Sequence, residues 1–472
     1  MDEGRVYLWR RIMSKQGVVI SLAAAISMTL AGLANAAVSP EEAARLGQDL
    51  TCVGAERAGN ADGSIPEFKG TYVGEVPGWN APPHSGAHPV DPFADDQPIL
   101  VITAANMAEH ADKLTVGQQA MFKRYPDTYK INVYEGRREF AYPEVVCERA
   151  KWNALNAEVV DDGFGYTGLG YVPFPIPKSA MEVLWNHQLP FRAWTQDEIR
   201  DIASVTANGS IGWGRSHGRC LAPPMDPDPN LRPHTDDGVS AYCTTEVLLP
   251  LRERGNTSLN HEPYNYRTAA RTAWSYNTGT RRVRLAPGYG YDQPLGGSNG
   301  LMTIDEDRLF NGAPDRYDWT LIGKQEIIIP ANAYKVHSKD ISYGDLLTVN
   351  HPNPDFLRYE LRRVWVIEAN VKEGSRHLYG KRRLFIDEDT WHAVLADNYD
   401  SRGELWKHAI INYYYHPDTS AWQAGTSFFH DLNSGGYIGY TLFNERERAA
   451  ILNKGEMDPS QFTPDRLRSM GR

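Results

Sequence analysis

The chain has 472 residues, a formal net charge of −10 and a sequence pI of about 5.8. An acidic chain of this kind lacks the net positive charge with which proteins bind nucleic acid or anionic lipid surfaces. Aromatic residues make up 11% of it, Tyr outnumbers Phe, and 41 Gly and 30 Pro are present, a composition that favours strands and loops over a helical bundle.

Residues 1–36 have the pattern of a signal peptide. Basic side chains up to Lys15 precede an apolar run at 18–34, which is too short and too rich in alanine for a typical membrane span. The Ala-Asn-Ala sequence that ends at Ala36 matches a cleavage site. We therefore expect a mature chain that starts at Ala37 and is exported to the periplasm. The alternative is an uncleaved membrane anchor.

Residues 37–190 are predicted to form a cover that is rich in helices and loops. Turn-forming residues dominate the first part of it. Thr115 and Gln118 have the spacing of a capping box, which favours a helix that begins just after Thr115. Helices are expected at 104–114, 116–124 and 143–157.

The segment 172–187 joins a proline-rich ribbon to a helix. Prolines at alternating positions fix φ near the polyproline value, so the ribbon can be neither a helix nor an inner strand. The helix that follows carries one apolar stripe. Its side chains and those of the ribbon predict either docking onto the protein's own core or a lid over a bound ligand. The candidates for a ligand cavity are Phe174, Ile176, Met181, Leu184 and Trp185.

After residue 190 the hydrophobic pattern changes to period two. Residues 270–285 predict a hairpin, and residues 358–415 predict a meander of four long strands. Neighbouring antiparallel strands of this length form curved sheets or open barrels. We therefore predict an α+β fold in one domain, with an antiparallel half-barrel at 191–472 covered by the helices of 37–190.

Four cysteines in an exported chain favour two disulfides. Of the three pairings that four cysteines allow, we favour Cys52 with Cys147 and Cys220 with Cys243. The second pair would close a short polar loop between two predicted strands. The alternative is a metal site, for which the C-x-x-C spacing is missing.

The run GRSHG around Ser216 matches the nucleophile elbow of serine hydrolases by letter. Asp236 or Asp237 and then His261 follow in the order of one kind of catalytic triad. The flanking residues predict neither the buried strand nor the helix of an elbow. We therefore expect a glycine-rich turn here, and a secreted serine esterase that uses Ser216 is the alternative function.

Four aspartates of the predicted meander could suggest a pair of catalytic carboxylates for glycoside cleavage. Each of them stands where a turn is expected to start, and there an aspartate accepts hydrogen bonds from nearby N–H groups. A structural role is therefore the better interpretation. The four are Asp387, Asp389, Asp397 and Asp400.

Five segments, in order along the chain, resemble the bacterial family known as domain of unknown function 1329. They are spread over nearly the whole mature chain, and none of them is a mechanism motif by itself. The segments are GAERAGNADGSIPEFKG, DPFADDQPILVITAANMAEHADKL, PFPIPKSAMEVLWNH, FNGAPDRYDWTLIGKQEIIIPANAYK and GKRRLFIDEDTWHAVLADNYDSRGELWK.

The family is similar to the carriers LolA and LolB, which sort lipoproteins to the outer membrane. This resemblance implies an open antiparallel half-barrel with helices over an apolar mouth, and it implies no catalytic residues. It also implies a membrane exporter as a partner, because members are often encoded beside efflux pumps of the resistance-nodulation-division type. Cys52 stands where the family usually has proline, and Cys147 stands in a helix that usually lacks cysteine. Two unusual cysteines together strengthen the case for pairing them.

The sequence offers no acid, base or nucleophile set in a supporting context, so we expect no enzyme activity, no cofactor and no metal. An open barrel leaves an interior large enough for a ligand. The chain is therefore predicted to be a periplasmic carrier of an apolar ligand, such as a lipid, a lipoprotein acyl chain or a hydrophobic metabolite. An accessory role to a membrane exporter is part of this prediction.

Overall fold

The computed structural model describes residues 38–72, 74–228, 230 and 238–470. The predicted signal peptide and its cleavage site lie outside these residues. No helix in the described part of the chain has the length and hydropathy that crossing a membrane requires.

Strands dominate the chain from residue 195 onward, where the period-two pattern begins. The strands are β1 (Leu100–Ile102), β2 (Ile131–Val133), β3 (Glu158–Val160), β4 (Gly165–Thr167), β5 (Thr195–Val205), β6 (Ile211–Leu221), β7 (Val239–Leu249), β8 (Thr257–Pro263), β9 (Thr272–Asn277), β10 (Arg282–Leu285), β11 (Tyr317–Pro330), β12 (Tyr359–Val371), β13 (Lys381–Asp387), β14 (Ala393–Tyr399), β15 (Leu405–His416), β16 (Ala421–Asp431), β17 (Tyr437–Leu442) and β18 (Ile451–Leu452).

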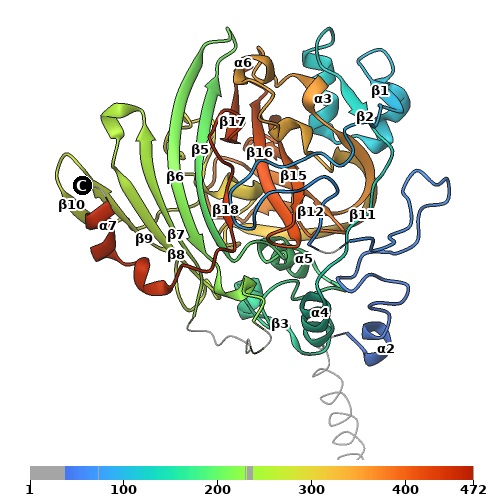
Figure 1. Cartoon of the computed structure of the whole chain (residues 1–472), viewed down its shortest axis with the longest axis horizontal. Coiled ribbons are helices and arrows are strands. Elements are labelled where there is room, and N and C mark those ends of the chain that lie inside the picture. The colour runs from blue at the N-terminus through green and yellow to red at the C-terminus, as the bar shows by residue number, and fades with distance from the viewer. Residues whose placement is uncertain (1–37, 73, 229, 231–237, 471–472) are drawn as a thin grey trace, which may run out of the picture.

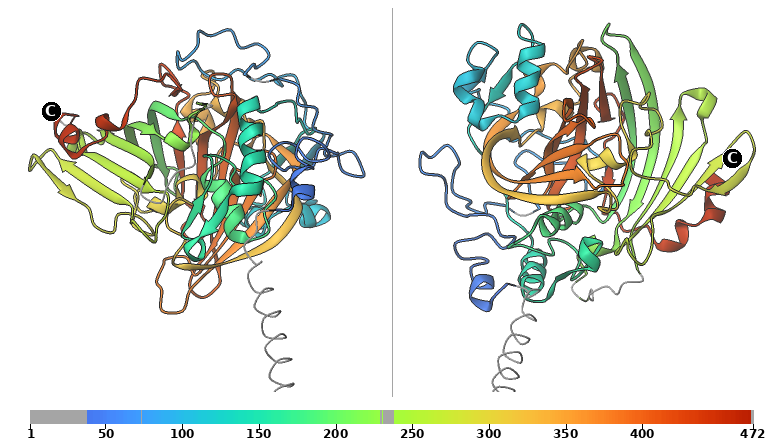
Figure 2. Two further views of the ribbon diagram at one scale, coloured as in Figure 1. Left: turned by 90° about the horizontal axis from the view of Figure 1, so that it is seen from below. Right: turned by 180° about the vertical axis from the view of Figure 1, so that it is seen from behind.

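Sixteen of the described strands form one sheet, and β3 and β4 form a separate pair. The order in the large sheet is β1-β2-β12-β13-β14-β15-β16-β17-β5-β6-β7-β8-β9-β10, with β11 beside β12 and β18 beside β5. Neighbours are antiparallel except β2 and β12, which are parallel. The sheet curves without closing, because β10 is a free edge far from β11 and β12 (Figures 1 and 2). The predicted α+β fold with an open antiparallel half-barrel is confirmed.

The predicted hairpin and meander are confirmed. β9 and β10 pair through Tyr276 and Val283, and β12 to β15 pair in sequence order. The sequence did not predict the antiparallel pairing of β17 with β5, in which Ile438 is opposite Ser204. It places the end of the chain beside the first long strand and makes one continuous sheet out of two groups of strands.

Helices and loops from the first part of the chain lie on one side of the sheet, where α3 (Val116–Arg124) contacts β14 and β15 and α5 (Ala180–Gln188) contacts β11 and β12. Thr115 caps its helix with a complete capping box to Gln118, and the Ser179 side chain accepts a hydrogen bond from the backbone N–H of Glu182 at the start of another helix. The segment around 107–113 is a 3₁₀ helix rather than the predicted α-helix. The α-helices are α2 (Pro40–Ala43), α3 (Val116–Arg124), α4 (Glu144–Asn156), α5 (Ala180–Gln188), α6 (Tyr343–Leu346) and α7 (Pro464–Met470).

Both predicted disulfides are present. Cys52 pairs with Cys147 of α4 and ties the N-terminal loop to that helix. Cys220 and Cys243 are direct partners in the register of β6 and β7, so the second disulfide crosses from strand to strand within the sheet.

Peptide mapping without reduction is expected to recover both disulfide-linked peptides from protein made in an oxidising compartment. Alkylation before reduction should leave all four cysteines unmodified. Recovery of alkylated Cys220 or Cys52 under these conditions would contradict the pairing.

Candidate ligand-binding cavities

Three neighbouring strands turn every second side chain toward one face of the sheet, where two cavities lie. On β5 these positions run from Gln196 to Ile202, and on β7 they run from Ala241 to Leu249. On β6 the alternate cavity-lining positions from Gly214 to Cys220 are glycine, serine, glycine and cysteine, and Arg215 also lines the first cavity. Small side chains on the middle strand leave room between the larger ones of its neighbours.

Gly218 shows how this room arises. It pairs directly with Glu198 of β5, and a Cβ atom added to Gly218 would meet no atom closer than 3.8 Å. Space, rather than a special backbone conformation, is therefore what glycine contributes at this position.

The first cavity has a volume of about 330 Å³ and is named here the aliphatic cavity. A ligand cavity of this size is at the lower end of the usual range for small-molecule sites. Its apolar walls come from β5, β7, β9, the loop 286–312 and β17. The apolar side chains are Ile202, Val247, Leu249, Pro250, Tyr276, Tyr289, Leu295 and Tyr440.

The second cavity, named here the charged cavity, has a volume of about 190 Å³. Arg200 lies at the boundary of the two cavities and lines both. Its guanidinium carbon lies 4.8 Å from the ring centre of Tyr440, and its Nη1 lies 2.5 Å from Glu198 Oε1. The interior is therefore only partly apolar, because this cavity is lined by four arginines and three carboxylates: Arg192, Arg200, Arg271, Arg308, Glu198, Glu262 and Asp307.

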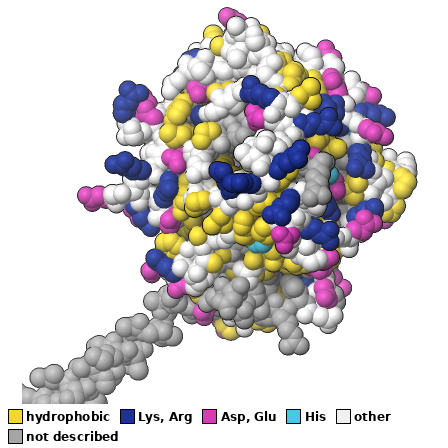
Figure 3. Space-filling view, turned by 90° about the vertical axis from the view of Figure 1, so that its left-hand side faces the viewer, with side chains coloured by type: hydrophobic (Ala, Val, Ile, Leu, Met, Phe, Trp, Pro, Cys, Tyr) yellow, Lys and Arg dark blue, Asp and Glu magenta, His cyan; other side chains and the backbone are white. Residues whose placement is uncertain are grey.

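The surface near the free edge of the sheet is rich in basic side chains. In the view from the β10 side, Lys and Arg side chains gather across the middle of the face, above a band of hydrophobic side chains (Figure 3). Arg281, Arg282 and Arg284 of the β9–β10 hairpin are exposed. An acidic protein thus presents local positive charge on this side.

The residues predicted for a ligand cavity are mostly in the core. Phe174, Leu184 and Trp185 are buried, with at most 8% of each exposed, whereas Ile176 and Met181 are half-buried. The Asn186 side chain holds the ribbon to the helix: its Oδ1 accepts from the backbone N–H of Phe174, and its Nδ2 donates to the carbonyl of the same residue. A ligand role for these five residues stays a prediction.

Trp185 lies closest to the cavities just described. It lines a third, small cavity of about 30 Å³, whose wall also includes Arg192 and Arg308 of the charged cavity. Its indole Nε1 donates to the carbonyl of Gly163 at 3.1 Å, so the side chain is fixed on the cover side of that wall.

The GRSHG run is strand, and the expected glycine-rich turn is wrong. Ser216 is in the middle of β6, opposite Arg200, and lines the aliphatic cavity with only 6% of its surface exposed. Its Oγ has no hydrogen-bond partner among the described residues, and His261 Nε2 contacts the carbonyl of Phe462 instead. The triad candidates Asp236 and Asp237 lie outside the described residues. In this geometry no described base activates Ser216.

Asp387, Asp389 and Asp400 lie at turns as predicted, but the predicted turn position of Asp397 is wrong. Asp397 lies inside β14, where its carboxylate accepts from the backbone N–H of Gly117 and contacts His408 Nδ1.

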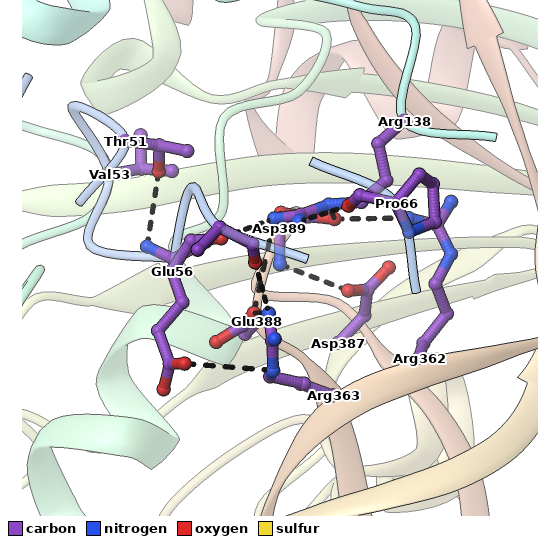
Figure 4. Close-up of polar contacts among 12 residues, drawn as sticks. Thr51, Val53, Glu56, Pro66, Arg138, Arg362, Arg363, Asp387, Glu388 and Asp389 are labelled. Carbon is purple, nitrogen blue, oxygen red and sulfur yellow. Dashed lines mark hydrogen bonds and ion pairs between the residues drawn. The ribbon is translucent and has the colours of Figure 1, made fainter. Parts of the chain in front are cut away.

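Asp389 is 3% exposed and accepts from Arg138 at 2.7 and 2.8 Å and from Arg362 at 3.0 Å. Arg138 and Arg362 converge on Asp389, and Arg363 lies beside Glu388 (Figure 4).

Charge crowding at this turn affects the neighbouring carboxyl. Burial raises the pKa of Asp387 to about 7, and the negative charge of Asp389 contributes to the rise against the opposing effect of Arg362. The cluster joins residues more than 200 positions apart in the chain and fastens the N-terminal cover to the β13–β14 turn.

A family model described as "Protein of unknown function (DUF1329)" matches residues 101–468. The chain belongs to this family. The uncharacterized protein PA3922 of Pseudomonas aeruginosa is 42% identical over 441 residues, which cover 92% of this chain and 94% of the relative. The predicted family membership is thus confirmed.

Three solved structures show weaker similarity. A putative outer membrane lipoprotein-sorting protein domain from Vibrio parahaemolyticus is 16% identical, with a TM-score of 0.40 over 58% of this chain and 91% of that chain. A DUF1329 family protein from Desulfovibrio piger is 14% identical, with a TM-score of 0.40 over 58% and 92%. A LolA superfamily protein from Nitrosomonas europaea is 13% identical, with a TM-score of 0.35 over 61% and 99%.

Proposed function

We propose that the protein is a periplasmic binding protein that carries a ligand with an apolar chain, such as a lipid, a lipoprotein acyl chain or a hydrophobic metabolite. The observation that carries this proposal is the aliphatic cavity on the face of an open sheet, joined to the charged cavity at Arg200. Burial of a chain in such a cavity stabilises the complex by about 0.8 kcal/mol per CH₂ group. Binding of this kind requires neither a nucleotide nor a metal.

The export signal pattern in residues 1–36 supports the periplasm as the place of action. The family resemblance supports delivery of the ligand to a membrane exporter of the resistance-nodulation-division type or to an outer-membrane partner. An open sheet suits such a transfer, since a ligand can leave at the unpaired edge without unfolding of a closed barrel.

Filling the aliphatic cavity is expected to weaken ligand binding. In Ser216→Leu, the new side chain enters the space beside Arg200 and Val247, and the affinity for a fluorescent fatty-acyl probe should fall about tenfold or more, the equivalent of losing two CH₂ contacts. Ser210→Leu is the matched control, because Ser210 is exposed in the turn of the same hairpin. The measurement is a fluorescence titration, with circular dichroism as the check of folding.

Equal affinities of the two variants for the probe would contradict the proposed cavity. Native mass spectrometry of the mature protein from its own periplasm should in addition reveal a co-purifying apolar molecule that Ser216→Leu retains poorly. Labelling of Ser216 by a fluorophosphonate, lost in Ser216→Ala, would instead support the esterase alternative.

A further inference from the structure

Two of the four arginines in the charged cavity are neutralised by partners. Arg200 pairs with Glu198 at 2.5 Å, and Arg271 pairs with Glu262 at 2.6 Å. Glu198 and Arg200 lie on β5, Glu262 lies on β8, and Arg271 directly precedes β9, so the sheet side of the cavity is balanced in charge.

The remaining two arginines have no such partner among the residues that the structure describes. Arg192 and Arg308 line the cavity, and neither forms an ion pair within 4.0 Å with any described residue. Asp307 is the remaining carboxylate among the described lining residues, and it accepts a long hydrogen bond of 3.4 Å from Asn311. Two guanidinium groups therefore face one carboxylate.

Hydrogen-bond donors at this wall also lack acceptors. Arg192 Nε, Arg308 Nη1 and the indole Nε1 of Trp422 are buried atoms without a hydrogen-bond partner among the described residues, and Trp422 is only 4% exposed. A buried donor without an acceptor is costly, and native proteins rarely retain one without a reason. These three unpaired donors along one cavity wall can bind a ligand group that carries several acceptor oxygens.

His392 indicates the sign of the field in this cavity. It is 2% exposed, lines the cavity, and neither ring nitrogen makes a hydrogen bond of ordinary geometry to a described residue. Burial lowers its pKa well below the usual value, and the positive charges of Arg192 and Arg308 add to this effect. Burial and the charge of Arg308 likewise lower the pKa of Arg192 to about 9. An anion in the cavity would relieve this repulsion.

The arginine on the covering loop is held firmly in place. Arg308 has φ of 53°, a left-handed conformation that a non-glycine residue adopts only when its surroundings impose it. The surroundings are strong here: Arg382 Nη1 binds Asp305 at 2.8 Å and Arg382 Nη2 binds the carbonyl of Leu309 at 2.7 Å. Arg308 is thus fixed from both sides in its position in the cavity wall.

We propose that Arg192, Arg308, His392 and Trp422 bind the anionic headgroup, a phosphate or carboxylate, of an amphiphile whose chain occupies the aliphatic cavity. This inference rests on the proposed carrier function and specifies the class of its ligand. Guanidinium groups suit such a headgroup because each can donate two parallel hydrogen bonds to its oxygens. Of the two paired arginines, Arg200 lies between headgroup and chain because it lines both cavities, and Arg271 adds to the wall of the charged cavity.

Isothermal titration of the mature protein with dodecyl phosphate, dodecanol and inorganic phosphate tests this assignment. The wild type is expected to bind dodecyl phosphate at least about tenfold more tightly than dodecanol, the effect of charge-assisted hydrogen bonds to one headgroup. Arg308→Gln and Arg192→Gln should each remove most of this preference and leave dodecanol binding unchanged. Arg402→Gln is the control, because 79% of the Arg402 side chain is exposed in the β14–β15 turn.

The possible outcomes test the headgroup site and the carrier function separately. Equal binding of dodecyl phosphate and dodecanol by the wild type overturns the anionic headgroup but leaves the carrier function standing. Binding of inorganic phosphate alone, lost in Arg308→Gln, keeps the anion site and overturns the carrier. If Arg308→Gln does not fold, Arg308→Lys replaces it, because lysine keeps the positive charge. This variant is expected to retain part of the wild-type preference for dodecyl phosphate over dodecanol. Full loss of that preference in a folded Arg308→Lys overturns the assignment of a cationic headgroup contact to this position.

Discussion

Replacing Asp389 with asparagine should lower the free energy of unfolding by about 3–5 kcal/mol, the usual cost of removing one partner from a buried ion pair. Arg138 and Arg362 both donate to this carboxylate, and at most 3% of any of the three side chains is exposed. Asparagine keeps the size of the side chain but removes its charge. Two buried guanidinium groups would then lose their shared counter-ion.

Urea denaturation followed by tryptophan fluorescence measures this change. Asp400→Asn is the matched control, since Asp400 pairs with the exposed Arg402 at the next turn of the same meander and such pairs contribute little. Limited proteolysis should also cut the N-terminal cover of Asp389→Asn faster, because Arg138 holds the cover to the sheet. Identical unfolding midpoints of the two variants would show that the cluster does not stabilise the fold.

Local signals in the sequence predicted the elements that depend on near neighbours. The capping box of Thr115 and Gln118 predicted the start of α3, and the period-two pattern of residues 358–415 predicted the meander of β12 to β15. These signals work because a helix end or a strand face is determined within a few residues. The disulfide of Cys220 and Cys243 could be predicted for the same reason, since its two strands follow one another in the chain.

The cavities could not be predicted in this way, because their walls come from pairings over long distances. Tyr440 and Arg200 share a wall only because β17 pairs with β5. The hydrophobic periodicity of the sequence does not predict which distant strands pair. Arg308 belongs to an irregular loop, where neither period two nor period 3.6 applies. The sequence did hold one signal: Glu198 and Arg200 are charged residues at alternate positions of β5, on the face that lines the charged cavity.

The GRSHG run illustrates how composition misled the interpretation. Glycines in a motif usually indicate a turn, whereas here Gly214 and Gly218 are strand residues that keep two cavities open. Asp389 shows the converse. Its place at a turn was predicted correctly, but its carboxylate accepts from arginines rather than from nearby N–H groups. Its main partner Arg138 is 251 residues away and could not be found from the sequence around the turn.

The contacts of Trp185 favour a core role over that of a lid. The side chain is 3% exposed, its indole N–H is bonded to the carbonyl of Gly163, and its ring lies 5.0 Å from that of Tyr166 and 6.4 Å from that of Tyr266. α5 itself contacts β11 and β12. A lid that opened on ligand exchange would have to break these contacts each time.

Trp185→Ala is therefore expected to lower the free energy of unfolding by about 3–5 kcal/mol, the cost of a cavity left by a large buried side chain. Trp152→Ala is the control, because Trp152 of α4 is 37% exposed and should change the urea midpoint little. Under conditions where Trp185→Ala is still folded, its affinity for dodecyl phosphate should stay close to that of the wild type, since Arg192 and Arg308 remain in the wall between the small cavity and the charged cavity. A large loss of affinity with an unchanged midpoint would reverse this assignment and identify α5 as the lid.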